Sequence, residues 1–256
     1  MILSERLEAV IGMVPYGSAV FDVGCDHGFV PIELVRRGIS PCCVASDVRE
    51  GPLRKAKEHI CEYGLSQRIA AVLADGVPKD LSGLRNLLCM ERETQLTLIT
   101  AGMGGLLMQS ILENAEERLS EFAWCILSPQ RNPESVRKTL RKLEFCITDE
   151  RMVLEDGKYY PVIKAGRADK GEEGAVFAAD DELLSECCDR YGPLLLERRD
   201  GILLSYLMKE KKELVKISSE MLKSAHGGDA FRNVEERIRL CKKALEIMEV
   251  PDENFG

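Results

Sequence analysis

Short apolar runs that end in an acid or a glycine recur along the first 130 residues of the chain. The best defined run, residues 19–23, leads into a turn with Gly24 and Gly28, and residues 31–37 then show helical spacing. A strand, a tight glycine turn and a helix together present backbone N–H groups and a helix N-terminus to a ligand. We therefore predict that a ligand site is built around this turn.

The same alternation of strand and helix continues along the chain. The predicted strands cover residues 19–23, 42–46, 69–73, 96–100 and 124–127, and the helices that follow them cover residues 31–37, 53–63, 107–112 and 133–143. A short helix over residues 3–13, with Ser4 as its N-cap, precedes the first strand. Strands that alternate with helices in this way predict a parallel sheet with right-handed crossovers.

Two strand-like segments, residues 145–154 and 159–165, then follow each other directly. The turn between them contains Asp156-Gly157, a pair typical of a tight hairpin turn, so we predict an antiparallel hairpin. The predicted fold class is therefore α/β, with a Rossmann-like, mostly parallel sheet, a late antiparallel hairpin and a C-terminal helical hairpin.

The composition changes from about Gly166. Residues 167–173 are charged and contain glycine, which indicates a linker or an exposed loop. We predict two domains, residues 1–166 and residues 167–256.

The second domain is predicted to be helical beyond Pro193. Apolar residues recur there with 3-4 spacing in two segments on either side of Gly227-Gly228, and Glu210 interrupts the first segment once. This pattern predicts an antiparallel coiled-coil hairpin. The alternative is an ordinary pair of helices that packs on the α/β domain.

Composition and charge exclude several classes of protein. The ten cysteines are scattered without a C-x-x-C pair, so we expect neither disulfides nor a metal site, and a reducing cytoplasm fits. We find neither a signal peptide nor an apolar run near the roughly 20 residues of a membrane span. The net charge of −8 argues against a protein that coats nucleic acid indiscriminately, but it allows a local basic face. We expect a monomer or a weak dimer.

The candidate site residues follow from where ligands bind in such folds, beyond the carboxyl ends of the strands. The five predicted strand ends carry Asp22, Gly24, Cys25, Asp26 and His27; Asp47 and Val48; Asp75 and Gly76; Ala101, Gly102, Met103, Gly104 and Gly105; and Ser128, Pro129 and Gln130. An acid about 20 residues beyond the glycine turn suits the hydroxyls of a ribose. Two carboxylates around the turn disfavour a phosphate and favour a cationic ligand, or one with hydroxyl and amine donors.

Enzymes that use NAD and enzymes that use S-adenosyl-L-methionine both place an acid on a ribose. Asp26 stands where a dinucleotide fold needs a glycine, and the late hairpin is typical of class I methyltransferases, so we favour S-adenosyl-L-methionine. Asp75 then suits the amine of an adenine. Local alternatives stay open: a turn or capping acid at Asp22, an N-cap at Asp47, an ordinary turn at Asp75-Gly76 and a packing residue at His27.

Several motifs together resemble one family. Residues 3–7, 22–27 and 101–105 and the helical hairpin are similar to the bacterial tRNA (adenine-22-N1)-methyltransferases, and the similarity covers essentially the whole chain. Residues 155–160 also resemble the hairpin of that family. One departure is that the family tends to have Gln-Pro-Asn after the fifth strand, where this chain has Ser128-Pro129-Gln130.

The resemblance implies methyl transfer from S-adenosyl-L-methionine to N1 of adenine 22 in the D-loop of tRNA. The cofactor would lie over Gly24, with Asp47 on its ribose, Asp75 near its adenine and Arg6 on its methionine carboxylate. The full predicted cofactor set is Arg6, Asp22, Gly24, Cys25, Asp26, His27, Asp47, Val48, Asp75, Gly76, Ala101, Gly102 and Met103.

The chemistry of the acceptor points to Asp26. Methylation of N1 leaves the adenine ring positive, and a carboxylate that polarises or deprotonates the N6 amine offsets that charge. The base must be turned out of the folded tRNA into a pocket, for which the loop at Met103 is a candidate wall. The candidate residues for the base are Gly104, Gly105, Ser128, Pro129 and Gln130.

The tRNA itself needs a binding surface. Lys209, Lys212 and Lys216 lie on the first predicted C-terminal helix and suit phosphate contacts, although interleaved acids also fit an ordinary solvated helix surface. Two other functions remain open: a methyltransferase for a small molecule or a protein, and a non-catalytic RNA-binding protein. The presence of Asp22, Gly24, Asp47 and Asp75 argues against a protein that has lost cofactor binding.

Overall fold

The computed structural model describes residues 3–167, 181–223 and 228–249. The chain divides into two compact units, residues 1–174 and residues 175–256. All but the first residue of the predicted linker at 167–173 lie outside the described residues, so the predicted domain boundary at residue 166 stays a proposal.

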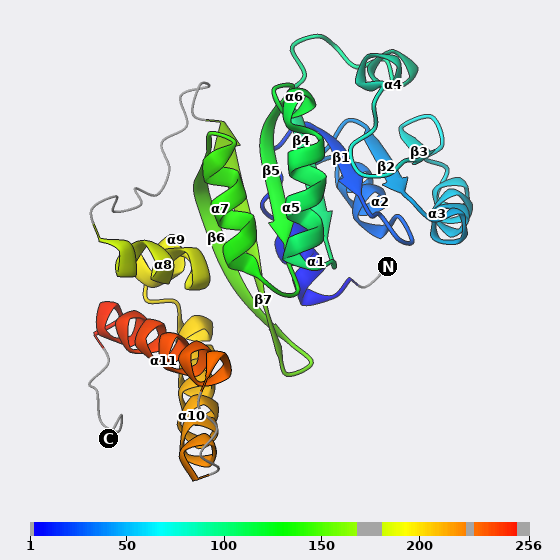
Figure 1. The fold of residues 1–256 in the computed structure, drawn as a ribbon. Helices are drawn as coiled ribbons and strands as arrows, with labels where there is room; N and C mark the ends of the chain where they lie inside the picture. The colour runs from blue at the N-terminus through cyan, green and yellow to red at the C-terminus, as the bar shows by residue number, and fades with distance from the viewer. Residues whose placement is uncertain (1–2, 168–180, 224–227, 250–256) are drawn as a thin grey trace. The chain divides into compact units, whose positions relative to one another are not determined.

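A seven-stranded sheet in the order β3-β2-β1-β4-β5-β7-β6 forms the centre of the first unit (Figure 1). Its parallel strands are β1 (Ala19–Val23), β2 (Cys43–Asp47), β3 (Ile69–Leu73), β4 (Leu96–Ala101) and β5 (Phe122–Ser128). An antiparallel hairpin of β6 (Phe145–Glu155) and β7 (Lys158–Arg167) joins the sheet through the pairing of β7 with β5. The predicted α/β fold with a late hairpin is confirmed.

Helices cover both faces of this sheet (Figure 1). On one face lie α5 (Gly105–Asn114) and α7 (Pro133–Lys142), and on the other lie α2 (Phe29–Arg36) and α3 (Glu50–Glu62). The reason is that the chain moves outward from β1 in one direction and from β4 in the other, so right-handed crossovers place the two helix pairs on opposite faces. Two further helices are α1 (Glu5–Ile11), which packs against α2 and the β6–β7 hairpin, and α6 (Glu116–Leu119), which leads into β5.

Burial of the central strands fits their apolar sequences. All five residues of β1 are buried, as a parallel strand covered on both faces requires. Phe21 of β1 packs edge-on against Phe122 of β5, with ring centroids 5.4 Å apart. Asp22 is the one charged residue in β1, and its burial marks the point where the core meets the candidate site.

Two short helices of the first unit were not predicted, namely α6 and the helix between β3 and β4. α4 (Leu81–Leu87) lies between β3 and β4, and its N-cap Asp80 accepts a hydrogen bond of 2.7 Å from the N–H of Gly83. The helix has only seven residues and contains Gly83, which weakens the helical signal, although Leu81, Leu84 and Leu87 recur three residues apart.

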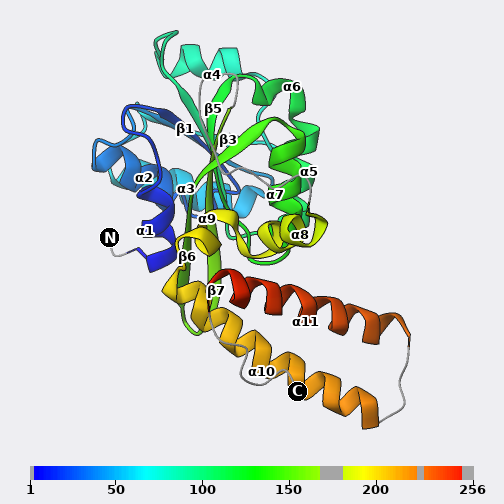
Figure 2. The ribbon, with the colours of Figure 1, turned by 90° about the vertical axis from the view of Figure 1, so that its left-hand side faces the viewer.

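Four helices form the described part of the second unit: α8 (Glu182–Tyr191), α9 (Pro193–Glu197), α10 (Gly201–Lys223) and α11 (Asp229–Ile247). α10 and α11 lie side by side (Figure 2), as predicted for the two C-terminal helices. Gly227 of the predicted turn lies outside the described residues, and coiled-coil geometry stays a prediction. The sequence did not predict α8, which packs against α11.

Glu210, the residue that interrupts the apolar spacing of α10, is buried in this unit. Its carboxylate accepts hydrogen bonds of 2.9 Å from Arg190, from Tyr191 and from Arg237, and so ties α8, α10 and α11 together. Burial alone raises the pKa of Glu210, but the charge of Arg190 and these hydrogen bonds outweigh burial and lower the pKa. The carboxylate is therefore charged in the core because three donors satisfy it.

Candidate active site

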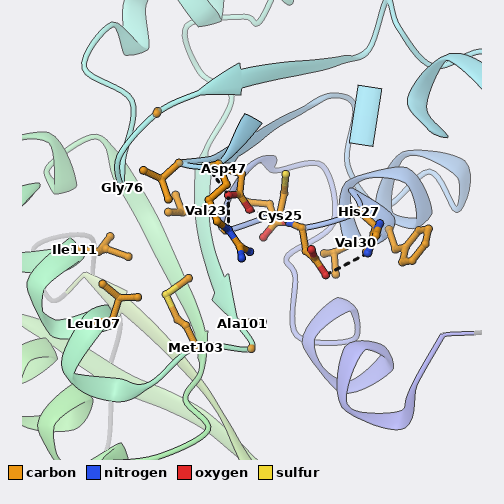
Figure 3. Close-up of a pocket in the computed structure, with 18 of the residues that line it drawn as sticks. Val23, Cys25, His27, Val30, Asp47, Gly76, Ala101, Met103, Leu107 and Ile111 are labelled. Atoms are coloured by element: carbon orange, nitrogen blue, oxygen red, sulfur yellow. Dashed lines mark hydrogen bonds and ion pairs between the residues drawn. The ribbon is translucent and has the colours of Figure 1, made fainter. Parts of the chain in front are cut away.

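A cavity of about 480 Å³ opens at the carboxyl ends of the parallel strands (Figure 3). The order of the sheet reverses between β1 and β4, so the loops after these strands diverge and leave a crevice. Every residue predicted for the cofactor lines this cavity, namely Arg6, Asp22, Gly24, Cys25, Asp26, His27, Asp47, Val48, Asp75, Gly76, Ala101, Gly102 and Met103.

The glycine turn after β1 is fixed to its neighbouring strand. The N–H groups of Gly24 and Cys25 both donate to the carbonyl oxygen of Ser46, at 2.8 and 2.9 Å. Gly24 has φ +78°, and a Cβ atom there would lie 2.6 Å from the Cε atom of Met103. Glycine at this position therefore permits both the left-handed turn and the close approach of the opposite wall.

Two buried acids lie in the wall of the cavity. Asp22 and Asp47 are 5% and 4% exposed. Asp47 accepts hydrogen bonds from the N–H groups of Asp26, at 3.3 Å, and Arg49, at 2.8 Å, so its side chain organises the loops after β1 and β2. No described residue donates a hydrogen bond to the side chain of Asp22, which belongs to β1 rather than to the turn or a helix cap.

Burial raises the pKa of Asp22 to about 7, and the negative charge of Asp47 adds to this effect. Burial and the same acids raise the pKa of the Cys25 thiol, so this cysteine stays protonated and is not a nucleophile. No described cation lies at Asp22 to favour its charged form, and a cationic ligand group would stabilise the carboxylate there.

Asp26 has a different environment from the other two acids. Its side chain is 63% exposed, and Oδ2 lies 3.7 Å from Nε2 of His27. Its backbone is left-handed, with φ 50°, and the hydrogen bond from its N–H to Asp47 holds this conformation. The His27 ring in turn stacks on Phe29, with centroids 5.5 Å apart. Asp26 is therefore an accessible carboxylate on a fixed backbone.

Arg6 supplies positive charge on another wall. Its side chain is 16% exposed, and its Nη1 atom is buried with no hydrogen-bond partner in the described part of the chain. This nitrogen lies 3.4 Å from the position that a Cβ atom on Gly102 would take. A buried guanidinium nitrogen without a partner is costly, so the site suits an anionic ligand group there.

Most of the apolar part of the cavity was missed by sequence reasoning. Leu107 and Ile111 line it beside the predicted Val48, and Val48 and Leu107 are largely exposed to solvent. The i, i+4 spacing of Leu107 and Ile111 was a possible signal, but the same spacing also describes an ordinary core helix. In Figure 3, Met103, Leu107 and Ile111 lie on one side of the cavity, and Cys25 and His27 lie on the other. The other lining residues not predicted are Leu7, Val23, Phe29, Val30, Arg49 and Ala74.

The structure brings only one of the predicted base-binding residues to the cavity. Gln130 lines it, whereas Gly104, Gly105, Ser128 and Pro129 do not. A Cβ atom on Gly105 would lie 2.2 Å from the carbonyl oxygen of Asn132, so this glycine permits close packing of α5 on the loop after β5. Ser128 is fully buried at the end of β5. A role of these four residues in base binding stays a prediction.

The predicted tRNA-binding lysines belong to the second unit. Lys209, Lys212 and Lys216 are exposed on α10, and their i, i+3 and i+7 spacing places them on one side of the helix.

No cluster of three or more potential metal ligands is present among the described residues. Within the same residues, no helix is long and apolar enough to span a membrane.

The match of residues 3–163 to the methyltransferase domain family (Methyltransf_18) shows that this chain is a member of that family. It is 26% identical over 247 residues to the tRNA (adenine(22)-N(1))-methyltransferase of Bacillus subtilis, an alignment that covers 95% of this chain and 97% of that protein. It is also 28% identical over 224 residues to a putative tRNA methyltransferase of Mycoplasma pneumoniae, covering 87% of this chain and 90% of that protein.

A similar solved structure is that of a putative tRNA (m1A22) methyltransferase from Streptococcus pneumoniae in complex with S-adenosyl-L-methionine. The TM-score is 0.75 at 27% identity, and the alignment covers 95% of this chain and all of that one. The likeness therefore includes the C-terminal helices as well as the methyltransferase domain.

Proposed function

We propose that this protein transfers a methyl group from S-adenosyl-L-methionine to N1 of adenine 22 in tRNA. The observation that carries the proposal is a single cavity, in a chain of the methyltransferase domain family, that combines an unneutralised carboxylate at Asp22 with an unpaired guanidinium nitrogen at Arg6. The reaction is that of the Bacillus subtilis relative, which aligns with nearly the whole chain.

The residues of the cavity suit each part of the cofactor. Asp47 holds the ribose hydroxyls, and Asp75 binds the adenine amine while Val48 and Ile111 cover the adenine faces. Asp22 faces the ammonium and sulfonium charges, since a buried carboxylate without a hydrogen-bond donor is stabilised by a nearby cation. When bound, the cofactor supplies an electrophilic methyl group on a cationic sulfur.

Arg6 completes the cofactor site by binding the methionine carboxylate. Its Nη1 atom has no hydrogen-bond partner among the residues that the structure describes, and a carboxylate accepts two parallel hydrogen bonds from a guanidinium. Asp22 and Arg6 thus bind opposite charges of the same amino-acid group.

Asp26 acts on the acceptor base. Its carboxylate accepts a hydrogen bond or the proton from the N6 amine of adenine, which offsets the positive charge that the ring gains when N1 is methylated. The backbone bond to Asp47 and the nearby ring of His27 fix the carboxylate without burying it. A preorganised acceptor of this kind costs little reorganisation when the base arrives.

The loop after β4 and the loop after β5 form the base pocket. The N–H of Gln130 donates to the carbonyl oxygen of Met103 at 2.9 Å, which joins the two loops. Met103 packs against one face of the base, and the amide of Gln130 bonds its edge in place of the Asn or Gln that the related family has nearby. An adenine turned out of the tRNA stack would be held there for in-line attack.

The exposed lysines of α10 bind the tRNA backbone. Lys209, Lys212 and Lys216 present a row of positive charge along one side of the helix, and phosphate contacts of this kind give affinity without reading the sequence. The base pocket then selects the nucleotide, and this row of lysines supplies affinity for the tRNA.

Incubation of the protein with S-adenosyl-L-methionine and an unmodified tRNA transcript tests the proposal. N1-methyladenine cannot form its Watson–Crick pair, so we expect a new reverse-transcription stop at adenine 22. The matched control is the same transcript with guanine at position 22, which should show no stop. Methylation at another position, or methyl transfer to small molecules or proteins but not to tRNA, would contradict the proposed function.

A further inference from the structure

One face of the β6–β7 hairpin, near its turn, packs against α1. Glu155 pairs with Lys158 and Val153 pairs with Tyr160 across the two strands. Residues that pair directly share a face of an antiparallel ladder, so Glu155 and Tyr160 point to the same side as diagonal neighbours. Both side chains contact Arg6, which is 149 residues before Glu155.

Glu155 makes two contacts with Arg6. Its Oε1 atom accepts a hydrogen bond of 3.3 Å from the backbone N–H of Arg6, and its Oε2 atom lies 4.0 Å from the Nε atom of the guanidinium. Arg6 is the second residue of α1, where a backbone N–H has no partner inside the helix. Glu155 therefore fixes the start of α1 and also orients the side chain of Arg6.

The aromatic ring of Tyr160 packs against the flat face of the Arg6 guanidinium. The Cζ atom of Arg6 lies 5.3 Å from the centroid of the Tyr160 ring, within the range of a cation–π contact. A planar guanidinium that rests on a ring keeps its N–H groups in the plane and available to an anion. The ring therefore restricts the side chain without using its hydrogen bonds.

These contacts leave one edge of the guanidinium free. Glu155 lies near Nε, and Nη1 is buried beside Gly102 without a hydrogen-bond partner among the described residues. Gly102 has φ +80° and lies at the turn after β4, where it also lines the cavity. The hairpin tip thus directs the open edge of Arg6 toward the cavity and not toward Glu155.

We propose that Glu155 and Tyr160 are positioning residues that hold the guanidinium of Arg6 beside Gly102 to bind the carboxylate of the cofactor's methionine group. The proposal rests on the proposed function, because it assumes that S-adenosyl-L-methionine occupies the cavity. It gives the late hairpin a role at a site built otherwise from the parallel strands. Preorganisation of Arg6 lowers the entropy lost when the carboxylate binds.

Comparing the binding of two ligands distinguishes a positioning role of Glu155 and Tyr160 from a general effect on the cavity. S-adenosyl-L-homocysteine carries the amino-acid group, whereas 5′-methylthioadenosine lacks it but retains the adenosine and the sulfur. Binding of both to the full-length protein is measured by calorimetry for the natural protein and for Tyr160→Leu, Tyr160→Phe, Glu155→Ala and Arg6→Gln. A melting curve of each variant reports whether it is folded.

We expect Tyr160→Leu and Glu155→Ala to weaken binding of S-adenosyl-L-homocysteine by roughly tenfold and to leave binding of 5′-methylthioadenosine unchanged. Tyr160→Phe keeps the aromatic face and should bind both ligands like the natural protein. Arg6→Gln should lose most of the preference for S-adenosyl-L-homocysteine, and adding Tyr160→Leu to it should cause no further loss.

An unchanged preference in both Tyr160→Leu and Glu155→Ala, with a reduced preference in Arg6→Gln, would overturn the positioning role and leave the cofactor site intact. An equal loss for both ligands in these variants would also overturn it, since that result indicates a general disturbance of the cavity. Failure of the natural protein to bind either ligand would contradict the proposed function itself.

Discussion

Asp22 is the penultimate residue of β1 and Asp47 is the last residue of the neighbouring parallel strand β2, and both carboxyl groups are buried in the wall of one cavity. Asp47 accepts hydrogen bonds from two backbone N–H groups, while no described residue donates to the side chain of Asp22. Burial, with a smaller contribution from the charge of Asp47, raises the pKa of Asp22 to about 7. The free protein therefore holds a carboxyl group that is readily protonated near neutral pH.

Cofactor binding should release a proton from Asp22. A cation beside the carboxyl favours its charged form and lowers its pKa, so about half a proton leaves at pH 7 if the pKa falls well below that value. Calorimetric titration with S-adenosyl-L-homocysteine in two buffers of different ionisation enthalpy measures this number. Asp22→Asn should abolish the release, and an equal release by both proteins would contradict the assignment.

The stability of the free protein should fall as pH rises toward and through 7. The pKa of Asp22 is raised on folding, from 3.8 to about 7. Between these values the folded state keeps a proton on Asp22 that the unfolded state has lost, so the free energy of unfolding falls as pH rises. Each unit of pKa shift corresponds to about 1.4 kcal/mol, so the free energy of unfolding falls by at most about 4 kcal/mol.

Denaturant unfolding of the free protein at pH 5.5 and pH 8.5 tests this expectation. Asp22→Asn cannot ionise, so the variant should lose less stability between these two pH values than the natural protein does. The same change in both proteins would show that Asp22 is not the source.

Asp26→Asn should reduce methyl transfer by ~10² to ~10⁴-fold in single-turnover assays and leave the affinity for S-adenosyl-L-homocysteine unchanged. Asparagine tolerates the left-handed backbone at this position, with φ 50°, better than alanine does. The Asn variant therefore removes the charge with little backbone strain, whereas Asp26→Ala also strains the left-handed backbone at this position. Retained turnover in Asp26→Asn would remove the carboxylate from the mechanism.

A double variant, Lys212→Gln with Lys216→Gln, should raise the KM for tRNA by roughly tenfold at similar kcat. Loss of two phosphate contacts should also reduce the slope of log affinity against log salt by about 1.5. Lys138→Gln, which removes an exposed charge from α7 in the first unit, is the control and should have little effect. Unchanged tRNA affinity in the double variant would argue for an ordinary solvated helix surface.

Glu210→Ala should destabilise the second unit by about 3–5 kcal/mol, because Arg190 and Arg237 would lose the carboxylate that they share in its core. Denaturant unfolding followed by circular dichroism measures the loss. The control is Glu213→Ala on the exposed side of α10, which should change stability by less than about 0.5 kcal/mol. Similar stability of the two variants would contradict a role for the buried network.

Much of the fold follows from local patterns. Apolar runs that end in Asp22 or Asp47 predicted buried parallel strands, and Asp156-Gly157 predicted the hairpin turn, because each signal depends only on neighbouring residues. The rule that ligands bind at strand ends then brought the predicted cofactor residues to one cavity. α4 was not predicted because it has only seven residues and contains Gly83, although its leucines recur three residues apart.

By itself, the sequence determined the order of strands and helices, the glycine turn and the acids at the strand ends. Only the tertiary structure decided that no described residue donates to the side chain of Asp22, that Glu210 is shared by two arginines, and that Arg6 is held by the hairpin tip. The physical reason is that desolvation and charge pairing depend on side chains that folding brings together from distant parts of the chain. Glu155 and Arg6, 149 residues apart, meet only once α1 packs against the hairpin.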